Sequence, residues 1–216
     1  MNIKKQIKLD LISIKPYFTF KNLLIFSGIA IFYVFITKSP NIILTMSMFF
    51  AMIFSAYLFL VGDNSGIDGI YRLFSIDSKN VVLARYILAL IIYVLASIIG
   101  LIYYLIVSII KSYPIDMEIL INFGVNFLVF AIIISLQYPI YFKFGYTKAK
   151  TWTILPIIIL GILGGAVGFL VKDIGEVINF AYQNKELIII SAIILVILII
   201  AITIKLSIKF YKQRDF

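Results

Sequence analysis

The feature that most constrains this chain is a series of long apolar runs without a charged residue. A helix needs about 20 apolar residues to cross the hydrocarbon core of a bilayer, and a lysine near its end can reach the headgroups. The chain therefore predicts an all-α, polytopic membrane protein. The six transmembrane helices are expected at roughly 18–37, 41–62, 81–110, 119–142, 151–171 and 187–208.

The basic residues lie mostly on one side of this expected topology. Fifteen of the 19 Lys and Arg residues fall in segments on the same side as the N-terminus. Such an excess marks the cytoplasmic side of a membrane protein. We therefore expect both termini to be cytoplasmic, and we attribute the net charge of +9 to orientation rather than to nucleic-acid binding.

Several kinds of chemistry are missing from the chain. It contains no cysteine and no histidine, which excludes disulfides, thiolate nucleophiles and imidazole bases. No Gly-rich phosphate-binding loop with the Gly-Lys-Ser/Thr ending is present. We expect no catalytic, cofactor-binding or metal-binding residue, so an enzyme is the least favoured class, and energy for transport would have to come from a partner.

The N-terminal segment, residues 1–16, is expected to be an amphipathic helix on the inner membrane surface. Its apolar residues recur at helical spacing as Ile3, Ile7, Leu11 and Ile14, with lysines between them. The alternative is a positively charged leader to the first span. Residues 17–216 are expected to form a single six-helix membrane domain that includes the 63–80 loop.

Two of the expected spans contain glycines or polar residues among the large apolar ones. In the fifth, glycines four residues apart would let another helix approach closely, and these are Gly161 with Gly165 and Gly164 with Gly168. In the fourth, Asn122 and Asn126 lie one turn apart. These amides would either bond to neighbouring helices or line a polar path, and the first alternative is favoured.

The longest inner loop, residues 63–80, contains a second pattern of interest. A short helix over about 67–74 would place Ile67, Ile70, Tyr71 and Phe74 on one apolar stripe. An exposed apolar stripe on a cytoplasmic loop must contact either the membrane surface or another protein. The loop is therefore the place to look for the partner that supplies energy.

The stretch from Asp63 to Tyr86 resembles the ABC-2 type permease family, in particular the small bacterial six-span permeases that include the phenol-soluble modulin exporters. The resemblance rests on the opening of the third span, which reads Val81, Val82, Ala84, Arg85 and Tyr86 after Lys79. The chain departs from the family at Ser75, where proline is usual, and at Ser78, where arginine is usual.

The resemblance implies the membrane subunit of an ATP-driven exporter in a bacterial plasma membrane. Separate cytoplasmic ABC ATPase subunits would bind ATP and Mg and receive a coupling helix. It also implies a second permease chain, paired through spans one and five, and the substrate would be amphipathic or lipophilic. The residues assigned to coupling are Ile67, Asp68, Ile70, Tyr71, Leu73 and Phe74.

Two other functions compete with this interpretation. One is the substrate-capture subunit of an energy-coupling-factor importer, but the Ala-x-x-x-Ala pattern of those proteins is missing, because Val34 follows Ala30. The other is a membrane scaffold without transport activity, for which the stripe at 67–74 would be the docking face. Co-purification of an ATPase would separate the permease from the scaffold.

Overall fold

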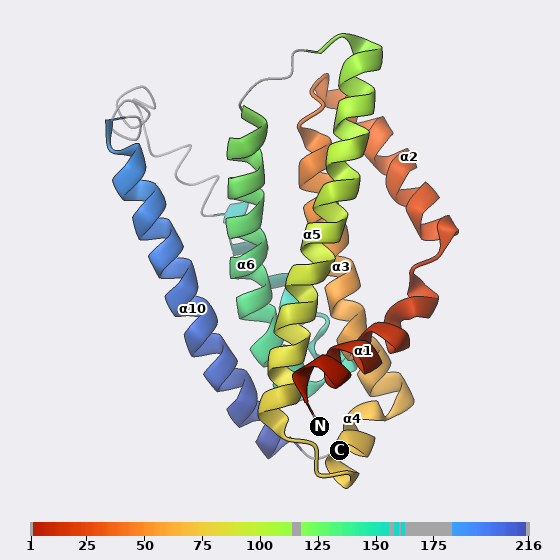
Figure 1. Ribbon diagram of the computed structural model, residues 1–216, viewed down its shortest axis with the longest axis vertical. Coiled ribbons are helices and arrows are strands. Elements are labelled where there is room, and N and C mark those ends of the chain that lie inside the picture. The colour runs from red at the N-terminus through yellow and green to blue at the C-terminus, as the bar shows by residue number, and fades with distance from the viewer. Residues whose placement is uncertain (1, 114–117, 156–157, 160, 163–182, 215–216) are drawn as a thin grey trace.

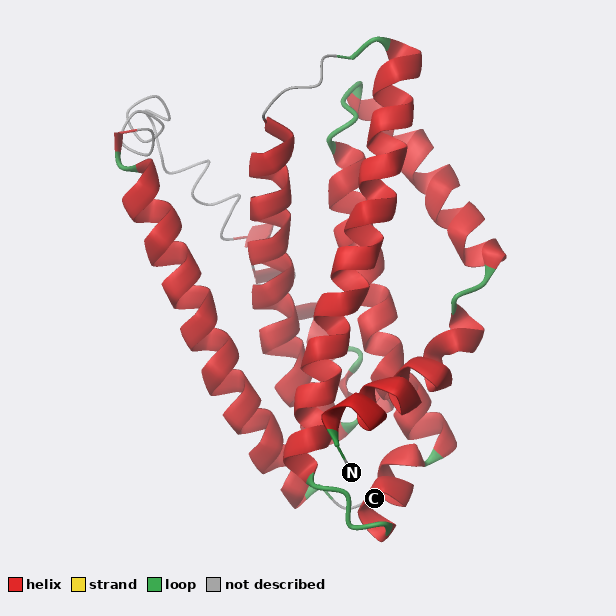
Figure 2. Cartoon of the chain, in the orientation of Figure 1, coloured by secondary structure: helices red, strands yellow, loops and turns green. Residues whose placement is uncertain are grey.

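The computed structural model describes residues 2–113, 118–155, 158–159, 161–162 and 183–214. Its described part is helical (Figures 1 and 2). Five of the helices are long and apolar enough to cross a membrane. The fifth expected span, at 151–171, lies largely outside the described residues.

The five long helices agree closely with the other expected spans. They are α2 (Phe20–Thr37), α3 (Ile42–Ser65), α5 (Ser78–Lys111), α6 (Glu118–Phe144) and α10 (Lys185–Gln213). The largest differences are that α3 ends later, α5 begins earlier and α10 ends later than expected. These extensions all lie at the end of the bundle where the charges gather, so apolar length alone did not reveal them.

Short helices connect or flank the long ones. They are α1 (Ile3–Ile14), the 3-10 turn η1 (Lys15–Tyr17), α4 (Ile67–Leu73), α7 (Tyr146–Ala149) and the 3-10 turn η2 (Trp152–Ile154). The helices expected in the N-terminal segment and in the 63–80 loop are therefore present, as α1 and α4.

Helices α3, α5 and α6 form the centre of the bundle, and α10 packs against α6 and α5 (Figure 1). Helix α2 contacts α3 and leaves much of its surface outside the protein, as expected for a helix that faces lipid. Helix α1 lies across α5 and α3 at the end of the bundle where α10 also ends (Figure 1). Both ends of the described chain therefore lie at one end of the bundle.

An aromatic cluster fills the core near that end. The Phe59 ring centroid lies 4.8 Å from that of Tyr138 and 4.9 Å from those of Tyr141 and Phe142. Tyr86 adds a further edge contact to Tyr138. Burial of such rings contributes strongly to packing, and it surrounds the polar groups described next with apolar walls.

Two glycines shape the chain at this end of the bundle. Gly66 has a φ of 65° and forms the turn between α3 and α4, while Gly145 has a φ of 76° between α6 and α7. A side chain disfavours both conformations. The two turns bring α4 and α7 back against the ends of the long helices.

Candidate functional site

A buried ion pair fastens α4 to the bundle. The Arg85 side chain is 1% exposed and that of Asp68 is 2% exposed. Arg85 donates hydrogen bonds to both carboxylate oxygens of Asp68, with Nη1 lying 3.4 Å from Oδ2. Gly62 of α3 leaves room for the pair, because a Cβ there would come within 2.8 Å of Asp68 Oδ2.

Aromatic rings enclose the guanidinium group. Arg85 Cζ lies 4.8 Å from the centroid of the Phe59 ring and 5.6 Å from that of Phe142. The ring faces favour a cation, and they exclude water from the ion pair. Arg85 is therefore held by one carboxylate and two rings inside the protein.

Asp68 also connects α4 to α10. The hydroxyl of Tyr211 donates to Asp68 Oδ1 at 3.4 Å, and Arg214 Nη1 lies 3.9 Å from Oδ2. Arg72 of α4 donates to the backbone carbonyls of Lys212, at 3.3 Å, and of Arg214. One short helix is thus tied to α5 by an ion pair and to α10 by several polar contacts.

A second set of polar contacts connects α4 to α1. The Tyr71 hydroxyl donates to Asp10 Oδ1 at 3.1 Å, and Gln6 Nε2 donates to the same oxygen at 3.2 Å. Gln6, Asp10 and Ile14 are the buried residues of α1. Two polar residues of α1 therefore point inward beside Ile14 while Leu11 is exposed, and the position of this helix on the membrane surface stays a prediction.

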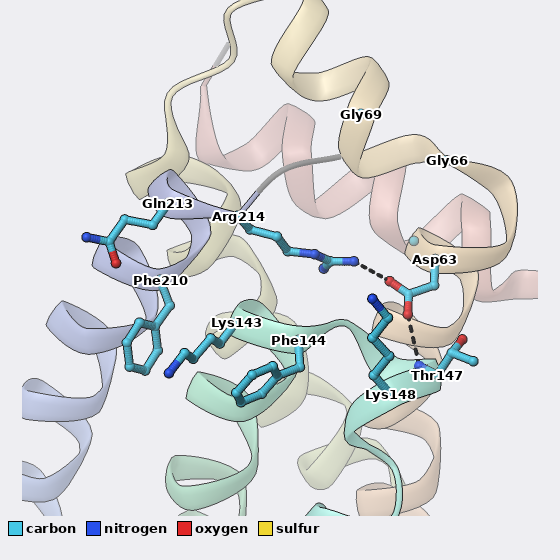
Figure 3. Close-up of a pocket in the computed structure, with 11 residues that line it drawn as sticks. Asp63, Gly66, Gly69, Lys143, Phe144, Thr147, Lys148, Phe210, Gln213 and Arg214 are labelled. Carbon is cyan, nitrogen blue, oxygen red and sulfur yellow. Dashed lines mark hydrogen bonds and ion pairs between the residues drawn. The ribbon is translucent and has the colours of Figure 1, made fainter.

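A third set of polar contacts joins α3, α7 and the end of α10. Arg214 Nη2 lies 2.8 Å from Asp63 Oδ1, and the backbone N–H of Thr147 donates to Asp63 Oδ2 at 2.9 Å (Figure 3). A Cβ on Gly145 would come within 2.7 Å of Asp63 Oδ2, so the glycine keeps space for this contact.

The outward face of α4 is apolar, but it differs from the expected stripe. Leu73 is 84% exposed, Phe74 is 77% exposed and Ile70 is 46% exposed. Tyr71 and Asp68 are buried, and Ile67 is half-buried against the core. The expectation that Tyr71 belongs to an exposed docking stripe is wrong, because its hydroxyl points inside and binds Asp10.

The other residues singled out from the sequence lie away from this cluster or outside the described residues. On α6, Asn126 is buried and Asn122 is half-buried one turn before it. A Cβ added at Gly161 would meet no atom within 4 Å, and Gly164, Gly165 and Gly168 lie outside the described residues. The role of the two asparagines in a polar path and the role of the glycines in permease pairing stay predictions.

The amide on α6 that does bond to a neighbouring element is that of Gln137. Its Nε2 donates to the carbonyl oxygen of Thr153 at 2.8 Å. Within the described residues, no group of three or more acidic, histidine or cysteine side chains could hold a metal ion. The polar groups at the end of the bundle are thus arranged to connect helices.

Burial raises the pKa of the Asp10 carboxyl above its ordinary value of 3.8, and the charge of Arg85 opposes this effect only in part. Asp68 adds to the rise, while the Tyr71 and Gln6 hydrogen bonds oppose it. A carboxyl with a higher pKa in the docked state binds its proton more tightly there than in the undocked state. Docking of α1 is therefore favoured at low pH and weakens as the pH rises through the raised pKa.

We expect the amides of α1 to exchange hydrogen faster as the pH rises in steps above the ordinary carboxyl value of 3.8, after correction for intrinsic rates, because the charged carboxylate disfavours docking. Asp10→Asn should remove most of this difference. Asp77→Asn is the matched control, since Asp77 is exposed and asparagine also caps a helix. Equal pH dependence in the wild type and Asp10→Asn would contradict the prediction.

Sequence patterns contained a partial signal for this cluster. Arg85 interrupts an otherwise apolar opening of the third span, in which Val81, Val82 and Ala84 are all fully buried. Asp10 is the only acid between the lysines of α1, four residues after Gln6. Either feature could have indicated an inward polar group, but neither identifies its partner.

Comparison with known protein families supports the resemblance seen in the sequence. The family described as ABC-2 family transporter protein matches residues 6–212. Neither a curated protein nor a solved structure gives a significant match to the chain. The family match extends from α1 to the end of α10 and so covers every helix of the buried cluster. Members of this family are membrane components of transporters, and this chain, a multi-pass membrane protein by its helices, belongs to the ABC-2 transporter family.

Proposed function

We propose that this chain is the permease subunit of an ATP-driven exporter, and that separate cytoplasmic ATPase subunits bind ATP and Mg and dock on α4. The observation that carries the proposal is the two-sided character of α4. Its inner side is bound to the bundle through Asp68 and Tyr71, and its outer side exposes Ile70, Leu73 and Phe74. The family match supports the transporter class.

The exposed side of α4 is suited to a protein partner. Three large apolar side chains lie together on a short helix at the end of the bundle that carries most of the charges. Contiguous exposed apolar residues with polar surroundings are typical of interaction sites. An apolar groove on an ATPase would bury these side chains and gain free energy from removing them from water.

The inner side of α4 is suited to transmit movement. Without contacts to the long helices, a seven-residue helix on a loop could be displaced by a partner and leave the rest of the bundle in place. Here the Asp68 contacts reach α5 and α10, and the Tyr71 contact reaches α1. Closure of an ATPase pair would therefore push several helices at once and open a path along the permease.

The walls of the bundle favour an amphipathic or lipophilic substrate. An apolar cavity of about 320 Å³ lies between α2, α3 and α5 and includes Phe18, Phe50 and Phe54. Some of the rings in spans one and two stack on one another, as Phe18 does on Phe54 with centroids 4.3 Å apart. These rings mainly pack helices, and the cavity between them carries no charged side chain to select an ion.

A second permease chain, identical or homologous, would complete the exporter in the bacterial plasma membrane. The exposed outer surface of α2 and the glycine-rich stretch that includes Gly161 are the surfaces proposed for pairing. Small residues at such a surface allow close backbone approach. Cross-linking of cysteines introduced on α2 of both chains tests this arrangement.

The ATPase proposal is tested by purifying the tagged chain from its native membrane and identifying co-purifying proteins by mass spectrometry. The wild type should retain a P-loop ATPase, and Leu73→Asp or Ile70→Asp should lower its yield about tenfold or more, because a charge would be desolvated in an apolar groove. Ile12→Asp is the matched control, since Ile12 is exposed at the same end of the bundle but on α1.

Unchanged ATPase yield with Leu73→Asp and Ile70→Asp would show that α4 is not the docking helix. If the wild type retains no ATPase in several mild detergents, the scaffold function replaces the exporter as the leading proposal. If the wild type retains an ATPase and the variants lose it, substrate-stimulated ATP hydrolysis in the reconstituted complex would distinguish transport from docking alone.

A further inference from the structure

A basic cavity of about 870 Å³ lies beside α4 but does not include its exposed face. Its walls come from the α3–α4 junction, from the α6–α7 junction and from the end of α10 (Figure 3). The cations that line it are Lys143, Lys148 and Arg214, and the only lining acid among the described residues is Asp63. The cavity is therefore positively charged.

The acid in the basic cavity is already occupied. Asp63 accepts from Arg214 through one oxygen, at 2.8 Å, and from the backbone N–H of Thr147 through the other, at 2.9 Å. No carboxylate in the described part of the chain lies within ion-pair distance of Lys143 or Lys148. The charges of Lys143 and Lys148 are thus not neutralised by a described carboxylate, and two such charges in one cavity attract an anion.

The wall next to Lys143 is aromatic. Its Nζ lies 4.9 Å from the ring centroid of Phe144 and 5.0 Å from that of Phe210. The rings position the ammonium group without neutralising its charge, so it can still attract an anion. They also offer apolar surface directly beside the charge, which favours an amphiphilic ligand over a simple ion.

The size and place of the basic cavity indicate the source of the anion. Its volume is in the range of sites for whole small molecules and is much larger than a single phosphate ion needs. It lies at the ends of α3, α6 and α10, which are long and apolar enough to span a membrane, and the headgroups around such a bundle are expected near these ends. Basic pockets between such helices bind anionic headgroups.

We propose that the basic cavity binds the phosphate of an anionic phospholipid. Lys143 and Lys148 contact the phosphate, and Phe144 and Phe210 pack against the glycerol and the first acyl carbons. Gly62, Gly66 and Gly69 line the opposite wall, which therefore carries no side chain from these three positions. Because α4, α6 and α10 all line the cavity, a bound lipid would hold these helices together, and this proposal does not depend on ATPase docking.

The test is a lipid titration of the purified full-length chain, delipidated in mild detergent and followed by native mass spectrometry. Phosphatidylglycerol and phosphatidylcholine with the same acyl chains are compared, since they differ in headgroup charge. We expect the wild type to prefer phosphatidylglycerol. Lys143→Gln combined with Lys148→Gln should weaken phosphatidylglycerol binding about thirtyfold, because each lysine near an anionic lipid contributes a factor of several.

The matched control is Lys8→Gln combined with Lys79→Gln, which removes two exposed lysines outside the cavity and leaves the same net charge. It should bind phosphatidylglycerol as the wild type does. Unchanged phosphatidylcholine binding shows that the cavity variant is folded. Equal affinity of the wild type for both lipids, equal losses in both double variants, or displacement of phosphatidylglycerol by millimolar inorganic phosphate would each overturn the lipid assignment.

Discussion

Replacing Arg85 with leucine is expected to lower the free energy of unfolding by about 3–5 kcal/mol, the usual cost of removing one partner of a buried ion pair. The variant removes the bidentate partner of the buried Asp68 and leaves it only Arg214, whose Nη1 lies 3.9 Å from Oδ2, and Asp10 loses the nearby cation that favours its charged form. The measurement is thermal unfolding of the purified chain in detergent. Lys79→Leu, which removes an exposed cation from the same helix, should change the midpoint little.

The paired variant distinguishes a specific ion pair from a general effect of arginine. Asp68→Leu alone should also destabilise the protein, because either change removes the close partner of a buried charge. The two changes together remove both charges and should cost clearly less than the sum of the single changes. Additive losses would mean that Asp68 and Arg85 do not stabilise each other, and the proposed anchoring of α4 would fail with them.

The long helices could be predicted from the sequence because their signal is local. Apolar runs without charges identify spans in any context, and the structure confirms those expected near 18–37, 41–62, 81–110, 119–142 and 187–208 as helices. The sequence signal for the short helix in the inner loop is also local, because Gly66 lies directly before it and apolar residues recur along it. Its role in coupling stays a prediction.

Most contacts of the buried cluster could not be predicted, because they join residues far apart in the chain. Tyr71 bonds to Asp10 across 61 positions, and Tyr211 bonds to Asp68 across 143 positions. Helical periodicity placed Tyr71 on an apolar stripe, since tyrosine is mostly apolar and its hydroxyl partner lies on another helix. Likewise, the sequence shows the Arg85 cation without the Asp68 carboxylate that pairs with it inside the protein.

A large loss of stability is also expected where α3 and α5 pack closely against each other. Gly100 of α5 faces Ser47 of α3, and a Cβ on Gly100 would lie 2.7 Å from both Cβ and Oγ of Ser47. Ser47 Oγ could rotate away, but Ser47 Cβ is fixed to the backbone, so a larger residue must move a helix. These two helices form the centre of the bundle, and a shift here changes the packing of α6 as well.

Gly100→Leu should therefore destabilise the protein by about 3 kcal/mol or more, at the upper end of overpacking effects, because the whole side chain must fit where a single methyl group already collides. Gly124→Leu is the matched control, since a Cβ on Gly124 of α6 meets nothing within 4 Å. The measurement is the thermal unfolding midpoint of each variant in detergent. Ser47→Gly should recover part of the loss from Gly100→Ala, and equal midpoints for Gly100→Leu and Gly124→Leu would show that α3 and α5 do not pack this closely.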